Sequence, residues 1–167
     1  MLRSLRAIEG AIDAVLQRVA VAGIVALIAV MSLQIVSRVV FTATSWTEET
    51  ARYLLIWLTF LGACLAYRRG RHIAVTVLSD ALPPLGQRVC RGLIALVTIA
   101  FMAVLLQVGL DYMALQSFQQ SAALRIPMSV VYAVMPLSAA IMAYMALIDL
   151  LEAVSGPPGD TADERHP

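Results

Sequence analysis

The chain has 167 residues, of which 60% are hydrophobic and 14% are charged, and its formal net charge at pH 7 is +1. This composition is far from that of a soluble domain, and so small a net charge indicates neither a nucleic-acid partner nor a strongly basic membrane-surface arm. All twelve basic residues are arginine. Without lysine the chain has no Walker A motif for ATP and no amine for Schiff-base chemistry, so we expect no nucleotide partner.

Four uncharged stretches dominate the sequence and alternate with segments that carry arginine. A membrane-spanning helix needs roughly 20 apolar residues at about 1.5 Å each to cross ~30 Å of hydrocarbon. The pattern therefore predicts an all-α integral membrane protein with four transmembrane helices in a lipid bilayer. Four crossings use most of the chain and leave no room for a soluble catalytic domain, so we expect no enzyme activity and no catalytic residue. The stretches are 19–37, 53–67, 92–110 and 126–148.

Residues that could hold a cofactor or a metal ion are scarce. The two histidines, His72 and His166, are too few to hold two bis-histidine haems. Cys64 lies within an apolar stretch and Cys90 within an arginine-rich segment, and their spacing fits no metal or redox motif. We therefore expect neither a cofactor nor a metal site.

The N-terminal segment, 1–18, has apolar side chains at helical spacing and charged side chains on its other faces. This pattern predicts an amphipathic helix at the membrane interface that runs into the first span, about 19–40. Arg3 and Arg6 resemble the start of a signal peptide. Acidic residues interrupt the following segment, however, and the apolar run is too long for a signal peptide, so we expect the segment to stay uncleaved.

The second span is predicted over about 46–67. The preceding connection, 42–47, is short, and a short link makes the first two spans an antiparallel hairpin. The run from Ser45 to Glu48 fits a capping box, which places the start of the second helix near Trp46.

The segment between the second and third spans, 68–91, carries five arginines. Within it, 72–82 is predicted as a short interfacial helix that ends before Pro83-Pro84, because proline removes a backbone donor and clashes with the preceding turn. A strand over 73–77 is the alternative, because apolar and other residues alternate there.

The third and fourth spans are predicted over about 92–110 and 126–148. Pro127 suits the first turn of the fourth helix, and Pro136 should kink that helix in its middle. We expect 1–155 to form one four-helix membrane domain, followed by a polar, proline-rich and disordered cytoplasmic tail, 156–167.

The distribution of arginine predicts the orientation. If the N-terminus is cytoplasmic, nine arginines lie in inside segments and three in outside segments. Because short cytoplasmic loops carry an excess of arginine, both termini of this multi-pass protein are expected in the cytoplasm. The three outside arginines are Arg38, Arg52 and Arg125.

A cluster of charged residues opens the second helix. Glu48 and Glu49 lie four and three residues before Arg52, so all three can meet on one helix flank. One interpretation is a helix cap at headgroup depth with an aromatic anchor. A second is a docking site for another membrane protein, because charges near hydrocarbon are costly unless paired. A third is a proton- or cation-coupling carboxylate, which the position at the edge of the span disfavours. The candidates for a partner interface are Trp46, Glu48, Glu49, Arg52 and Trp57.

Two groups of residues match motifs of a known family. The first comprises Trp46 to Tyr53, Trp57, Phe60 to Ala63, Arg68 and His72 to Val75; the second comprises Gln120 to Met128, Tyr132 and Pro136. Over roughly 40–150 the chain resembles the DctQ-type small membrane subunit of tripartite ATP-independent periplasmic (TRAP) transporters. The positions for which this resemblance implies a structural role are Gly62, His72, Pro127 and Pro136.

The resemblance implies a function that is shared with other chains. In such a system a periplasmic binding protein captures an organic acid such as a dicarboxylate and delivers it to a large membrane subunit. The large subunit moves the substrate with a sodium gradient, and the small subunit is its scaffold partner in the bacterial inner membrane. Two alternatives remain, an autonomous four-helix proton-coupled exporter and a membrane anchor or assembly subunit of an unrelated complex.

Overall fold

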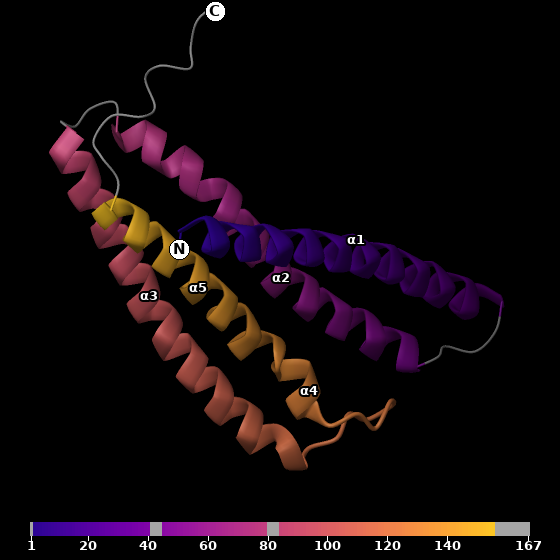
Figure 1. Ribbon diagram of the computed structural model, residues 1–167. Coiled ribbons are helices and arrows are strands. Elements are labelled where there is room, and N and C mark those ends of the chain that lie inside the picture. Colours follow the sequence, from indigo (N-terminus) through magenta and orange to yellow (C-terminus); the bar gives the residue numbers. More distant parts are fainter. Residues whose placement is uncertain (1, 41–44, 80–83, 156–167) are drawn as a thin grey trace, which may run out of the picture.

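The computed structural model describes residues 2–40, 45–79 and 84–155, with side chains over 8–40, 45–70 and 86–154, and forms no β-strand over these ranges. Four of its helical segments are long and apolar enough to cross a membrane, which confirms the predicted all-α membrane fold. In chain order the elements are α1 (Leu2–Val40), α2 (Ser45–Ser79), α3 (Pro84–Leu115), the 3-10 turn η1 (Gln116–Phe118), α4 (Met128–Tyr132) and α5 (Val134–Ser155) (Figure 1).

Helix α1 joins the amphipathic lead-in and the first span without interruption. Its 39 residues correspond to a length of about 58 Å, almost twice the hydrocarbon thickness. No proline breaks the segment, so the lead-in continues the axis of the span and does not form a separate helix. Glu9 and Leu16 in the lead-in are buried, which shows that this part of α1 packs against other helices of the chain.

Helix α2 begins at Ser45, as the capping pattern predicts, but continues to Ser79. The predicted interfacial helix over 72–82 is thus the last part of a single long helix as far as the structure describes it, and the alternative of a strand over 73–77 is wrong. The physical reason is that no proline occurs between 45 and 79. Gly70 alone costs a helix only about 1 kcal/mol relative to alanine.

The fourth span is divided, as Pro136 predicts. Helix α4 ends at Tyr132 and α5 starts at Val134, with Ala133 between them. Proline has no N–H to donate to the carbonyl four residues earlier, which here is that of Tyr132, and its ring clashes with that carbonyl. Pro127 lies just before the first residue of α4, with φ −57° and ψ 129°.

The helices lie side by side in the order α1, α2, α5, α3, so the protein is an open row and not a closed bundle (Figure 1). Helix α1 packs along α2 and α3 packs along α5, and the two pairs meet where α2 passes α5. Within the described residues α1 and α3 do not touch. The core of the row is a cluster at this meeting point, formed by Leu16, Leu61, Cys64 and Met145.

Helix α3 approaches α5 closely at Gly109, beside the proline break. A Cβ atom added at Gly109 would lie 3.2 Å from both the backbone nitrogen and Cδ of Pro136. Neither atom can move easily, because both belong to a rigid proline ring. A larger residue at this position would therefore force α3 and the divided helix slightly apart.

We expect Gly109→Ala to lower the thermal unfolding midpoint of the detergent-solubilised chain, because overpacking of this kind typically costs about 1–3 kcal/mol. Gly92→Ala is the matched control in the same helix, since a Cβ atom there meets nothing within 4 Å. The control should be neutral or stabilising, because alanine is the better helix former. Equal midpoints for the two variants would contradict the assignment of a tight contact at Gly109.

Candidate functional site

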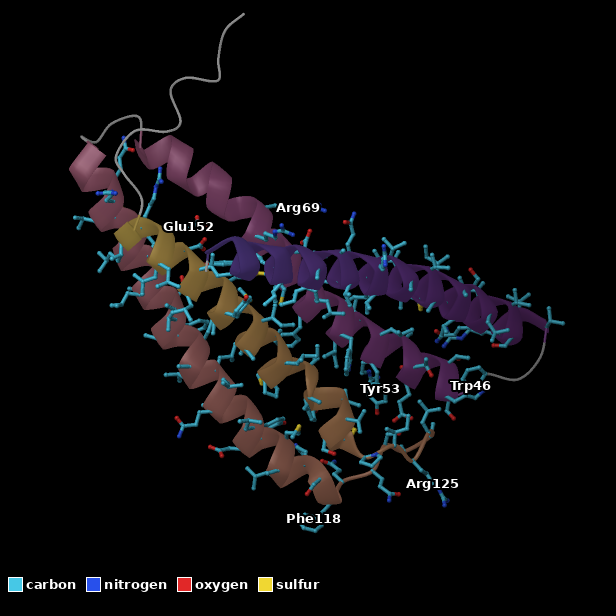
Figure 2. The ribbon with its side chains drawn as sticks, in the orientation of Figure 1. Trp46, Tyr53, Arg69, Phe118, Arg125 and Glu152 are labelled. Carbon is cyan, nitrogen blue, oxygen red and sulfur yellow. The ribbon has the colours of Figure 1, made fainter. Side chains whose placement is uncertain are left out.

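The five candidates for a partner interface lie in the first part of α2, where Figure 2 labels Trp46, and their contacts divide them into three groups. Glu49 contacts the loop between α3 and α4. Trp46, Glu48 and Arg52 are exposed. Trp57 packs against the core cluster inside the chain. The charged residues that the sequence places on one flank therefore have different partners.

The carboxylate of Glu49 accepts four hydrogen bonds. The amide of Ala122 donates to Oε1 at 3.1 Å, and the amides of Ala123 and Leu124 donate to Oε2 at 3.0 and 2.9 Å. The hydroxyl of Tyr53, one turn further along α2, donates to Oε1 at 2.9 Å. Successive backbone amides that point at one anion form a binding concavity, and hydrogen bonds to an ionised acceptor are the stronger kind. We call this arrangement the Glu49 latch.

The loop is shaped to present these amides. The amide of Ser121 donates to the carbonyl of Ile126 at 2.9 Å, and the amide of Met128 donates to the carbonyl of Gln119 at 2.8 Å. These two bonds close a narrow turn whose inner amides are left for the carboxylate. Arg125 makes the turn possible with a left-handed φ of 52°, a conformation that costs an ordinary residue roughly 1–2 kcal/mol.

Glu48 and Arg52 form an ion pair on the exposed surface of α2. The distance between Arg52 Nη2 and Glu48 Oε1 is 3.5 Å, and the two side chains are 67% and 63% exposed. An exposed pair at this spacing contributes only about 0.3–0.5 kcal/mol. The pair therefore does little for the stability of the isolated chain and is free to meet another surface.

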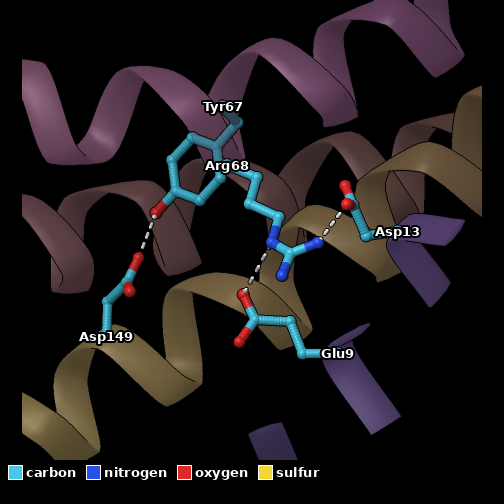
Figure 3. A network of polar contacts seen from close by, with 5 residues as sticks. All are labelled: Glu9, Asp13, Tyr67, Arg68 and Asp149. Carbon is cyan, nitrogen blue, oxygen red and sulfur yellow. Dashed lines mark hydrogen bonds and ion pairs between the residues drawn. The ribbon is translucent and has the colours of Figure 1, made fainter. Parts of the chain in front are cut away.

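A second polar network lies toward the other end of the α2 span (Figure 3). Arg68 of α2 forms ion pairs with two acids of α1, with 3.8 Å between its Nε and Glu9 Oε1 and a short contact from its Nη1 to Asp13. The preceding residue, Tyr67, donates a hydrogen bond of 3.2 Å to Asp149 of α5. Three helices are thus tied together within one turn of α2. We call this group the Arg68 network.

The sequence analysis missed the Arg68 network, because it assigned Arg68 to the arginine-rich connection. A usable signal was present. Glu9 and Asp13 are four residues apart, so they lie on one face of α1, and Arg68 belongs to the motif that carries the family resemblance. Two acids on one helix face require a cation when that face is packed.

The positions for which the resemblance implies structural roles have separate places. Pro127 and Pro136 flank and break the divided fourth helix. Gly62 lies on α2 with open space around it, since an added Cβ atom would meet nothing within 4 Å. His72 lies in α2, after residue 70, where the structure describes the backbone helix but not the side chains. The predicted tail, 156–167, lies outside the described residues.

The row of spanning helices defines a multi-pass membrane protein whose polar residues mainly hold the chain together. Residues 27–156 match the family of the tripartite ATP-independent periplasmic transporters, DctQ component. The chain therefore belongs to this family of TRAP transporter small permease subunits.

Individual relatives agree with this membership. A TRAP transporter small permease protein of Haemophilus influenzae is 43% identical over 72 residues, which are 40% of this chain and 45% of that protein. The isethionate TRAP transporter permease protein DctMQ of Oleidesulfovibrio alaskensis is 31% identical over 139 residues, 78% of this chain and 22% of that protein. The sialic acid TRAP transporter small permease protein SiaQ of Vibrio cholerae is 34% identical over 85 residues, 50% of this chain and 46% of that protein. The matches span less than half of the length of each of these relatives.

Proposed function

We propose that this chain is the scaffold partner of a large TRAP membrane subunit in sodium-driven, binding-protein-dependent uptake of an organic acid such as a dicarboxylate. The observation that carries the proposal is the match to the DctMQ permease protein. That match covers 78% of this chain but only 22% of the relative. A segment like this chain and a much larger remainder therefore belong to one permease polypeptide in that organism.

The chemistry of the described spans supports a scaffold and not a carrier. An anion site within a bilayer needs convergent donors, such as the ends of broken helices or buried basic residues. The hydroxyl groups of two threonines in the spans instead donate to carbonyls of their own helices: Thr59 to Leu55 and Thr98 to Ile94, each at 2.8 Å. The loop amides that do converge on an anion already donate their hydrogen bonds to the carboxylate of Glu49.

Reconstituted transport tests the division of labour. Proteoliposomes with an imposed sodium gradient should take up radiolabelled dicarboxylates only when this chain, the large subunit and the periplasmic binding protein are all present. This chain alone should give uptake equal to that of empty vesicles. Sodium-driven or proton-driven flux through this chain alone would contradict the scaffold proposal and favour the autonomous exporter.

The proposed orientation has both termini in the cytoplasm and the protein in the inner membrane, on the basis of the arginine asymmetry. In cells with a Cys64→Ala, Cys90→Ser background, Gln120→Cys should react with an impermeant thiol reagent added from outside. Val154→Cys, which lies at the opposite end of the fourth span, should not react. Both positions are exposed. The reverse pattern of labelling would invert the orientation.

A further inference from the structure

The outward faces of α1 and α3, the two ends of the row, suit hydrocarbon. Between 19 and 37 on α1 and between 93 and 110 on α3, most of the exposed side chains are large and apolar, and the exposed charged residues lie outside these stretches (Figure 2). Such faces lose nothing when they contact lipid tails. On α1 they include Val21, Val25, Ile28 and Ile35, and on α3 they include Leu93, Val97, Phe101 and Val104.

Helix α2 has a different exposed stripe. From Glu48 onward its exposed residues recur every three to four positions along the span, so they lie on one face. Leu55 is the only large apolar side chain among these residues, Trp46 being exposed before them at the start of the helix, and the span itself is the least apolar of the four. We call this stripe the α2 outer face, and its residues are Glu48, Arg52, Leu55, Thr59, Ala63, Ala66 and Arg69.

Two glycines, Gly62 and Gly70, add to the small residues along this face. A Cβ atom added at Gly62 or at Gly70 would meet nothing within 4 Å, so neither glycine is needed for packing within the described chain. Small residues on a membrane helix allow a second helix to approach its backbone closely. Small residues alone would also tolerate lipid, so this feature does not identify what covers the face.

The ion pair at the start of the same face is a second feature that suits protein better than lipid. Glu48 and Arg52 fall within the candidate span Ser45–Gly70, in line with the small residues, and both are mostly exposed. Charged groups in a spanning segment usually face protein or a water-filled cavity. A face that begins with two charges and continues with small residues is a poor lipid surface and a good surface for a helix.

We infer that the α2 outer face docks a transmembrane helix of the large permease subunit, while the outward faces of α1 and α3 contact lipid. The inference rests on the proposed function and adds the location of the interface. The occupant follows from the DctMQ relative, in which sequence like this chain is part of a longer permease polypeptide. The partner helix crosses close to α2 at Ala63 and Ala66, with polar groups opposite the ion pair.

Bulky substitutions test the location. The chain is co-expressed with the large subunit of its own transport system and purified through a tag on the small subunit. Ala63→Trp and Ala66→Trp should each reduce the recovered large subunit at least tenfold, because the ring keeps the partner helix away. Ile28→Trp on α1 and Val97→Trp on α3 are the matched controls at exposed positions and should stay within twofold of wild type.

The outcomes separate the two proposals. If wild-type chain recovers no large subunit, the proposed function fails. If it recovers the subunit and only Ile28→Trp or Val97→Trp abolishes recovery, or no variant does, the function stands and the location is overturned.

A photo-crosslinker at position 63 should join this chain to the large subunit. A crosslinked product of two small subunits would instead show that the face is a contact between copies of this chain. All four tryptophan variants should unfold at the wild-type temperature when purified alone, because the altered positions do not pack within the chain.

Discussion

Replacing Glu49 with glutamine is expected to weaken the hydrogen bonds that hold the loop between α3 and α4 against α2. Oε2 of the carboxylate accepts from the amides of Ala123 and Leu124 at 3.0 and 2.9 Å. In glutamine one of the two terminal atoms becomes an NH₂ group, so donors would face donors. Removing a charged acceptor from several donors at once should raise the amide hydrogen-exchange rate of 122–124 on the order of tenfold or more.

Glu48→Gln is a close control for Glu49→Gln. The two residues are neighbours on α2, but the Glu48 side chain is exposed and forms its ion pair with exposed Arg52. Its replacement should leave exchange in the loop unchanged. Tyr53→Phe removes one of the four donors of the Glu49 latch and should have a smaller effect than Glu49→Gln. Equal exchange in the Glu48 and Glu49 variants would show that the latch does not hold the loop.

Replacing Arg68 with alanine is expected to have the larger effect on stability. Glu9 is 4% exposed, and the substitution removes the guanidinium that faces both Glu9 and Asp13. Removing one partner of a buried ion pair typically costs about 3–5 kcal/mol. Arg68 and Asp13 remain 28% and 27% exposed, so we expect the low end of that range, measured by thermal or denaturant unfolding of the chain in detergent micelles.

Arg69→Ala controls for the loss of one positive charge at this end of the membrane. Arg69 is the next residue on α2 and is exposed, so its removal changes the charge asymmetry equally but leaves the Arg68 network intact. Its unfolding midpoint should stay near that of wild type. If both variants are equally destabilised, the effect belongs to membrane insertion and not to the network. A triple variant with Glu9→Gln, Asp13→Asn and Arg68→Met should recover part of the loss, because no unpaired charge is left.

The latch and the network connect the open row of helices toward opposite ends of the α2 span. Helices in lipid gain little from the hydrophobic effect on association, so packing and interhelical hydrogen bonds matter more. The Glu49 latch joins α2 to the loop before α4 at one end, and the Arg68 network joins α1, α2 and α5 toward the other. The core cluster lies where α2 meets α5. The proposed scaffold role requires fixed geometry of this kind more than it requires a binding site.

The sequence by itself determined the local features of this protein. The four apolar segments, the start of α2 and the break before Pro136 all follow from neighbouring residues: hydropathy over a span, a capping pattern and a missing N–H. In the segment after Gly70, neighbouring residues did not distinguish a helix from a strand. Its alternating apolar residues also fit a strand, and α2 in fact continues as a helix to Ser79.

Only the tertiary structure decided which partner each polar residue meets. Spacing allows Arg52 to pair with Glu48 or with Glu49, and the choice depends on a loop that lies 73 to 75 positions from Glu49 along the chain. Arg68 reaches Glu9 for the same kind of reason, through the packing of α1 against α2. The order of helices in the row and the exposed stripe of α2 depend on how each helix is rotated about its axis. Those rotations are set by contacts between distant segments, which hydropathy and spacing within one segment do not encode.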